Sequence, residues 1–162
     1  MFKPDEMAIG LRPADPQDCQ RLWDWRNETS TREASLDTSV IPYQDHKTWF
    51  MQKMHSQETH ILIITDDSKL EVGYVRFDIS GNEAEISVGI DERARGRGYG
   101  SAAIRKASNL LLSTNNLTRI TAHIKLDNAQ STGAFLNAGF VSVGTTKLSG
   151  TDVYKMILDR CR

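Results

Sequence analysis

One segment of the chain has residue types and a spacing that could bind an anion. Residues 95–100 read Arg-Gly-Arg-Gly-Tyr-Gly, follow an alternating apolar pattern over 84–90 and precede a helical pattern that begins at Ser101. Such a junction presents unpaired backbone N–H groups and the positive end of a helix dipole to one point. Gly98 and Gly100 lack the Cβ atoms that would keep an anion away. The segment therefore predicts a pyrophosphate site.

Two other phosphate motifs do not fit these residues. A Rossmann fingerprint follows a strand near the start of a βαβ unit, and a P-loop ends in Gly-Lys-Ser/Thr. Neither condition is met at residues 95–101. A glycine run that serves only to turn the chain tightly stays an alternative.

A second set of residues could handle a proton. Strand alternation places Glu85 and Ser87 on one face of a predicted sheet. The same alternation adds four polar residues from neighbouring strands to this face: Arg76, Asp78, Thr121 and His123. In the alternative interpretation, Arg76 and Glu85 form a cross-strand ion pair and His123 is a half-buried structural residue.

The elements that must position these residues form a mixed α/β pattern. Hydrophobic periodicity, helix caps and turn residues predict helices and strands. The predicted helices are 16–27, 42–54, 101–114 and 128–138, and the predicted strands are 9–12, 60–65, 72–78, 83–90, 119–124, 140–148 and 152–158. Ser80-Gly81-Asn82 predicts a hairpin turn. The strands 60–65, 72–78 and 83–90 should therefore form an antiparallel meander.

The totals limit the class of protein. The 162 residues, 39% of them hydrophobic, predict one domain over 1–162. A net charge of −1 argues against a nucleic-acid binder. No stretch has the length of a signal peptide or a membrane span, which predicts a soluble, cytoplasmic protein. Cys19 and Cys161 lack partners at metal-ligand spacing, so we expect free thiols and no metal site.

Two motifs together resemble the GNAT superfamily of acyl-CoA N-acyltransferases. The first is the glycine turn between a strand and a long helix, and the second is Asn128-x-x-Ser131-x-x-x-Phe135-x-x-x-Gly139-Phe140. The resemblance implies a GNAT fold, an α/β (α+β) architecture with a mixed sheet of about six to seven strands, splayed at the fourth and fifth, and about four helices. It also implies acetyl-CoA as co-substrate and allows a homodimer.

The resemblance assigns residues to acetyl-CoA. The backbone of the glycine turn would bind the pyrophosphate, and the main chain of the preceding strand would pair with the pantetheine arm. The implied contacts are Val88, Gly89, Ile90, Arg95, Gly96, Arg97, Gly98, Tyr99, Gly100, Ser101, Asn128 and Phe135. Asn128 could instead serve only as a helix cap.

Phe135 departs from the family pattern. Many members have a tyrosine there that protonates the departing CoA thiolate, and a phenylalanine cannot donate a proton. Because this thiolate is a fairly stable leaving group, water or Ser131 could supply the proton. Catalysis itself also needs a base, since the acceptor amine must be uncharged to attack the thioester. Glu85 is the first candidate, His123 the second and His46 the third.

The N-terminal third resembles the GNAT branch that acetylates nucleotide-linked amino sugars, such as those on the route to pseudaminic acid. The residues that carry this resemblance include Trp25-Arg26-Asn27, Arg32, Ile41-Pro42, His46-x-x-Trp49-Phe50 and Gly73 to Asp78. The implied acceptor contacts are Trp25, Arg26, Asn27, Arg32, His46 and Arg76. Arg26 and Arg32 are the candidates for a substrate phosphate, while Trp25 and Trp49 are also compatible with core packing.

Three functions follow from this sequence. The first is acetyl-CoA-dependent N-acetylation of a small-molecule amine, most simply a nucleotide-linked amino sugar, by direct attack without a covalent intermediate. The second is acetylation of a protein or peptide N-terminus, which an acidic groove near the first two helices would favour. The third is a CoA-binding module without turnover, which Phe135 would favour.

Overall fold

The computed structural model describes residues 8–161 and contains a seven-stranded sheet of order β1-β2-β3-β4-β5-β7-β6. The strands are β1 (Gly10–Pro13), β2 (Thr59–Thr65), β3 (Glu71–Ser80), β4 (Glu83–Ile90), β5 (Arg119–Lys125), β6 (Val141–Leu148) and β7 (Thr151–Asp159). The helices are α1 (Cys19–Asn27), α2 (Thr29–Ala34), α3 (Tyr43–His55), α4 (Tyr99–Thr114) and α5 (Ala129–Asn137), with 3-10 turns η2 (Pro16–Asp18) and η3 (Glu92–Ala94).

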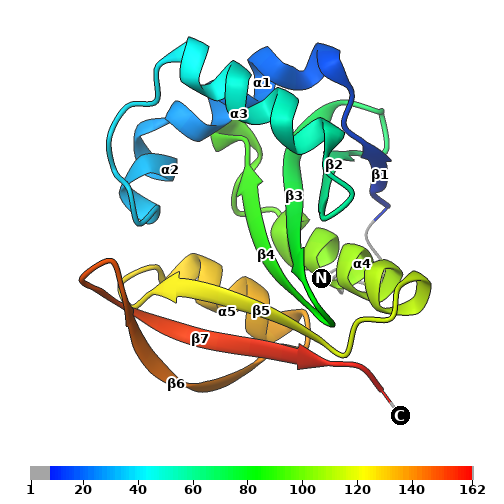
Figure 1. Ribbon diagram of the computed structural model, residues 1–162, viewed down its shortest axis with the longest axis vertical. Helices are drawn as coiled ribbons and strands as arrows, with labels where there is room; N and C mark the ends of the chain where they lie inside the picture. Colours follow the sequence, from blue (N-terminus) through cyan, green and yellow to red (C-terminus); the bar gives the residue numbers. More distant parts are fainter. Residues whose placement is uncertain (1–7, 162) are drawn as a thin grey trace.

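Helices cover both faces of the sheet (Figure 1). On one face, α4 and α5 pack over a core that includes Phe77, Ile104 and Phe140. On the other face, α1 and α3 cover β2 and β3 through a second core that includes Trp25 and Phe50. The alternation of side chains along each strand sends one set of residues to each core.

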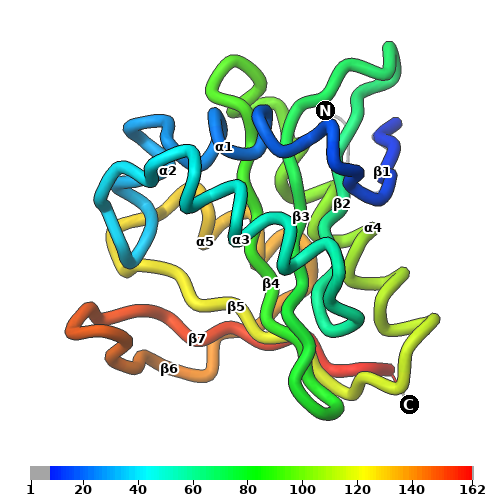
Figure 2. The backbone as a smooth tube through the Cα atoms, turned by 45° about the horizontal axis from the view of Figure 1, so that its top comes forward, coloured from blue at the N-terminus to red at the C-terminus, as the bar shows by residue number. Residues whose placement is uncertain are grey.

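The sheet opens between β4 and β5. All neighbouring strands are antiparallel except this pair, which is parallel and joined only at Glu83 to Glu85, opposite Arg119 to Thr121. Beyond Glu85, the two strands diverge, as the tube in Figure 2 makes visible. The main chain of β4 from Ile86 to Ile90 therefore has β3 on one side and no β5 partner on the other.

The predicted strands and the splay are confirmed, and the helix prediction needs two corrections. The first turn of the predicted helix 16–27 is a 3-10 turn capped by Asp15, and α1 begins at Cys19. Helix α2 was not predicted. It has six residues and buries none of them, so it leaves no hydrophobic periodicity in the sequence.

Within residues 8–161, no helix combines the length and the apolar character that crossing a bilayer requires.

Candidate active site

The glycine turn forms an open cradle of backbone amides at the start of α4. Gly96 and Gly98 adopt φ angles of 77° and 89°, which side-chain-bearing residues rarely adopt. The first intrahelical bond runs from Ala102 N to Gly98 O at 3.1 Å, so the preceding amides lie outside the helical hydrogen-bond pattern. No side chain caps this helix, and its first turn contains no acid. A pyrophosphate fits such a site.

The two arginines of the turn and Arg93 just before it have different surroundings. Arg95 points inward, where its guanidinium donates to Ile90 O at 3.1 Å, to Glu28 Oε2 at 3.1 Å and to the hydroxyls of Ser30 and Thr31. It thus ties the turn to α2. Arg93 pairs with Asp91. Arg97 is exposed and makes no hydrogen bond or ion pair with residues 8–161, which leaves its side chain available to a phosphate.

The predicted pantetheine partners lie along the open edge of β4. Val88, Gly89 and Ile90 are each partly exposed, and they belong to the stretch that has no partner in β5. An unpaired strand edge offers N–H and C=O groups to another extended chain. The amide groups of a pantetheine arm fit this edge.

Helix α5 borders the same opening. Asn128 caps it, accepting a hydrogen bond from Ser131 N at 3.2 Å through Oδ1, and its Nδ2 amide makes no bond within residues 8–161. Ser131 is partly exposed. Phe135 is only 3% exposed, and its ring packs edge-on against Phe140 at 5.1 Å between centroids. Its contact with acetyl-CoA stays a prediction.

Glu85 and His123 meet across the junction of β4 and β5. His123 Nδ1 lies 3.2 Å from Glu85 Oε1, and their side chains are 19% and 54% exposed respectively. The alternative pairing of Arg76 with Glu85 is wrong: Arg76 binds Asp78 Oδ2 at 2.9 Å and Ser87 Oγ at 3.3 Å. A carboxylate in contact with an imidazole can accept and pass on a proton.

A cluster of Arg26, Trp49 and Arg76 lies beside these residues, and we call it the arginine–tryptophan cluster. The two guanidinium groups lie 4.3 Å and 5.2 Å from the centroid of the Trp49 ring. The carboxylate of Asp78 binds both Arg76 and Lys53. Two cations therefore share one carboxylate.

Arg26 has no carboxylate partner within residues 8–161. Its closest polar contact is His46 Nδ1 at 3.5 Å from Nη1. Burial lowers the pKa of Arg26, Tyr74 opposes this shift, and the like charge of Arg76 adds to it. Because an unpaired, partly buried cation is costly, this position favours an anionic ligand.

His46, the third candidate base, is fully buried and structural. Its Nε2 lies 2.9 Å from Cys19 O, so this nitrogen carries the proton and Nδ1 accepts from Arg26. Burial lowers the pKa of His46, while the Cys19 carbonyl opposes and Arg26 supports the shift. The structure thus places His46 beneath the cluster, as the residue that positions Arg26.

The remaining predicted acceptor residues have partners within the fold. Trp25 is 2% exposed and donates from Nε1 to Asp91 Oδ2 at 2.9 Å. Asn27 holds the main chain of Ile41 through two hydrogen bonds. Arg32 donates to Asn27 O and Thr38 O. These contacts account for the three side chains, and their part in acceptor binding stays a prediction.

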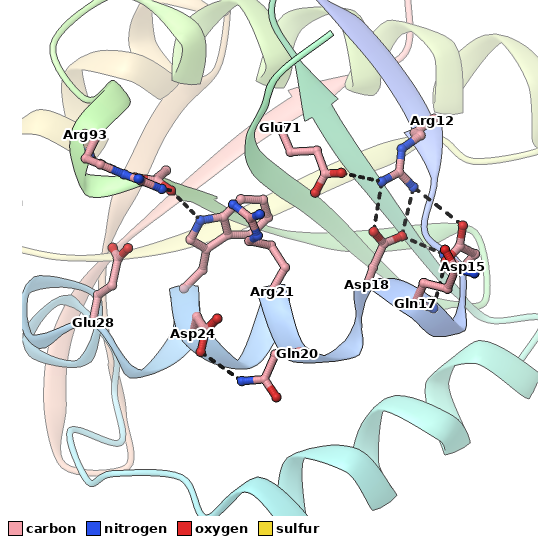
Figure 3. Close-up of a pocket in the computed structure, with 12 residues that line it drawn as sticks. Arg12, Asp15, Gln17, Asp18, Gln20, Arg21, Asp24, Glu28, Glu71 and Arg93 are labelled. Atoms are coloured by element: carbon pink, nitrogen blue, oxygen red, sulfur yellow. Dashed lines mark hydrogen bonds and ion pairs between the residues drawn. The ribbon is translucent and has the colours of Figure 1, made fainter.

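A groove of about 630 Å³ lies along α1 (Figure 3), and neither Glu85 nor His123 lines it. Its carboxylates outnumber its arginines. Most of them pair with an arginine, but Asp24 bonds only the Gln20 amide. Arg12 bridges Asp18 and Glu71, as Figure 3 shows, and Arg93 holds Asp91. The groove therefore carries more negative than positive side chains, although most of its carboxylates are engaged by arginines.

Two features of the sheet face that carries Arg76 and Glu85 were not predicted from the sequence. Gly89 lies opposite Tyr74 in the β3–β4 register, and a Cβ atom on Gly89 would lie 2.5 Å from the tyrosine ring. Lys53 was also missed, although it supplies a second cation to Asp78 beside Arg76. A glycine inside a predicted strand is the signal that could have indicated the close approach.

Comparisons with known proteins agree with this geometry. A family model described as an acetyltransferase (GNAT) domain matches residues 8–141. The Bacillus subtilis (strain 168) protein named "Putative phosphinothricin acetyltransferase YwnH" is 26% identical in an alignment 142 residues long, which covers 83% of this chain and 85% of YwnH.

Solved structures show the same fold. The spermidine N-acetyltransferase from Vibrio cholerae in complex with CoA and spermine superimposes with a TM-score of 0.85 at 18% identity, covering 94% of this chain and 95% of that one. The aminoglycoside acetyltransferase AAC(6')-Ib in complex with coenzyme A gives 0.83 at 19% identity, with coverages of 94% and 95%.

Proposed function

Since the chain belongs to the GNAT acetyltransferase family and is an N-acetyltransferase that uses acetyl-CoA, we propose that its acceptor is a small amine that carries an anionic group, as a nucleotide-linked amino sugar does. The arginine–tryptophan cluster is the observation that carries this proposal. Family membership leaves no reason to retain a CoA-binding module without turnover.

The charge balance near the cluster supports an anionic acceptor. Lys53 and Arg76 share the carboxylate of Asp78, and Arg26 has no carboxylate partner among residues 8–161. A phosphate or carboxylate of the acceptor would supply an anionic partner through bidentate bonds with a guanidinium. A polycation such as a polyamine would instead be repelled.

For the chemistry, we propose that the Glu85–His123 pair removes the proton from the acceptor amine. The neutral nitrogen then attacks the acetyl carbon directly, and a backbone N–H of the β4 edge stabilises the oxyanion. The cradle at Gly96 to Ser101 would hold the pyrophosphate, and the edge at Val88 to Ile90 would hold the pantetheine arm. When bound, acetyl-CoA supplies the activated acetyl group.

Two other classes of acceptor are alternatives. The cluster suits a free amino acid with acidic groups equally well, and the name of YwnH points to phosphinothricin, an amino acid of that kind. A peptide N-terminus is favoured by the excess of carboxylates in the groove along α1, but most of these carboxylates already pair with arginines.

The test is CoA-thiol release from acetyl-CoA with separate pools of nucleotide-linked amino sugars, phosphinothricin, ribosomal N-terminal peptides and polyamines. We expect release with an anionic acceptor. In Arg26→Gln, the KM for that acceptor should rise at least about 10-fold, the loss of one charge-assisted bond, while the KM for acetyl-CoA stays unchanged.

Arg21→Gln is the matched control. Arg21 lies on the same helix and also over a tryptophan, at 5.8 Å from the Trp25 ring, but it lines the groove along α1. Its replacement should leave both KM values unchanged. Release confined to peptides or polyamines would contradict the proposed acceptor and leave the acetyltransferase assignment intact.

A further inference from the structure

Tyr74 has a hydroxyl group to which neither the fold nor the proposed chemistry gives a role. It lies on β3 and is 8% exposed. Its ring stacks on Trp25 with 6.2 Å between centroids and an interplanar angle of 20°. Trp25 is itself fixed by its hydrogen bond to Asp91. The ring of Tyr74 is therefore held in one position.

The ring of Tyr74 reaches across to β4. Tyr74 pairs with Gly89 in the register of the two strands. A Cβ atom built on Gly89 would lie 2.5 Å from Cε1, 2.9 Å from Cζ and 3.1 Å from the hydroxyl oxygen of Tyr74. Since neighbouring strands lie about 4.8 Å apart, the hydroxyl lies above β4 and beyond its own strand. Gly89 is required there because any side chain would fill this space.

The hydroxyl has no hydrogen-bond partner within residues 8–161. In the described chain, two fully enclosed side-chain polar atoms lack a hydrogen-bond partner, Arg105 Nε and Ser108 Oγ. The Tyr74 hydroxyl oxygen is not one of them. The ring is thus buried while the hydroxyl oxygen is not fully enclosed. A phenylalanine would pack against Trp25 and Gly89 equally well, so packing does not explain the oxygen.

We propose that Tyr74 donates the proton that the departing CoA thiolate requires. This inference rests on the proposed pairing of the pantetheine arm with Val88 to Ile90, which places the thioester along the residue that Tyr74 covers. Phe135 has no proton to give. Tyr74 supplies the missing donor from a different element, β3 instead of α5.

Acetyl transfer forms one bond and breaks another. The amine nitrogen forms a bond to the acetyl carbon, and the carbon–sulfur bond breaks with its electron pair staying on sulfur. The Tyr74 proton moves to that sulfur, which leaves CoA as the thiol. Water then returns a proton to the phenolate, while the proton of the amine leaves through Glu85 and His123 to solvent.

The test compares Tyr74→Phe with Tyr43→Phe. Tyr43 is a partly exposed residue of α3 whose hydroxyl contacts Cys19 Sγ, away from the proposed site. We expect Tyr74→Phe to lower kcat about 100-fold, within the range of general-acid contributions, with both KM values unchanged. Tyr43→Phe should match the wild type.

A binding experiment supplies a readout that does not depend on turnover. Affinities for CoA and for desulfo-CoA, which lacks the sulfur, are measured by calorimetry at pH 7 and pH 9. A thiol ionises near pH 8.5, and the Tyr74 hydroxyl can donate a hydrogen bond to a thiolate. The preference of the wild type for CoA over desulfo-CoA should therefore be stronger at pH 9 than at pH 7. Tyr74→Phe should lose this increase while retaining its affinity for desulfo-CoA.

Three results would overturn the inference. The first is an unchanged kcat in Tyr74→Phe. The second is a rise in only the acceptor KM of Tyr74→Phe, which would make Tyr74 an acceptor contact. The third is a loss of kcat in Ser131→Ala but not in Tyr74→Phe. A separate result bears on the site itself: if desulfo-CoA fails to bind the wild type, the proposed position of the pantetheine arm is wrong.

Discussion

At the scale of single residues, contact geometry separates groups that the sequence could only place on one face. Glu85 and His123 are in contact, whereas Arg76 turns to Asp78. Strand alternation predicted the shared face correctly, because side chains repeat every two residues. It could not predict which of several neighbours on that face would pair, because this depends on side-chain rotamers.

The paired arrangement predicts how catalysis responds to the loss of Glu85. Glu85→Gln should lower kcat about 100-fold or more, the usual contribution of a general base, without changing the affinity for acetyl-CoA. If the two residues act as one unit, adding His123→Gln should cause little further loss. Steady-state kinetics of the four proteins of this cycle provide the measurement.

Glu83→Gln is the control for this series. Glu83 lies on the same face of β4, and its charge interacts with Arg119 at 3.9 Å. It should keep a kcat within about two-fold of the wild type, as expected for a surface change. A wild-type rate for Glu85→Gln at neutral pH would remove Glu85 from the mechanism.

Gly89 provides a second prediction at this scale. In Gly89→Ala, the new methyl group would overlap the Tyr74 ring, since its carbon would lie 2.5 Å from Cε1. The overlap should lower the free energy of unfolding by about 1–3 kcal/mol, as overpacking does. Urea denaturation measures the effect.

Gly133→Ala is the opposite case. Gly133 lies inside α5, and an added Cβ would meet nothing within 4 Å. This change should stabilise the protein by about 1 kcal/mol, the difference in helix propensity. Equal effects of the two substitutions would contradict the close approach at Gly89.

At the scale of elements, α1 and α3 are joined through His46. It connects the Cys19 carbonyl at the start of α1 with the guanidinium of Arg26 near the end of the same helix. The sequence indicated a helix and a histidine on it, but not that the histidine would be buried and neutral.

His46 predicts a pH dependence of stability. Because burial lowers its pKa in the folded protein, the unfolded state binds more protons below about pH 6.5. The contribution of neutral His46 is therefore present above that pH and is lost as the pH falls, with a slope of at most about 1.4 kcal/mol per pH unit. Between pH 7.5 and pH 5.5, the free energy of unfolding of His46→Gln, measured by urea denaturation, should fall less than that of the wild type.

His55 serves as the reference on the same helix. It is exposed and bonds only the Met51 carbonyl, so His55→Gln should keep the pH dependence of the wild type. Identical slopes in all three proteins would show that His46 does not titrate on unfolding.

At the scale of the whole molecule, the splay between β4 and β5 leaves the sheet with an internal edge. Acetyl-CoA would extend this edge as a strand does, joining the β1–β4 half to the β5–β7 half. Amides of residues 86–90 that face β5 should therefore exchange rapidly in the free protein and at least about 10-fold more slowly with saturating CoA.

Hydrogen exchange with mass spectrometry measures this protection. Binding at 100 times the dissociation constant should also raise the free energy of unfolding by about 2.7 kcal/mol. Strand β3 is paired on both sides, so its amides should change less. Protection confined to the groove along α1 would place CoA there instead.

The sequence alone determined the order of elements, the glycine turn and the family. These features depend on local periodicity and on backbone conformations that glycine adopts, such as the φ of 89° at Gly98. The family match over residues 8–141 and the shared fold confirm them. The extent of a single domain over 1–162 stays a prediction.

Only the tertiary structure decided which polar residues are free to act. Asn27 and Arg32 bind the chain's own carbonyls, and His46 is enclosed in the core. Arg26 lacks a counter-ion, and Tyr74 lacks a hydrogen-bond partner, among the residues that the structure describes. Such differences arise from contacts between residues distant in sequence, because burial and pairing depend on where other elements pack, which local patterns do not contain.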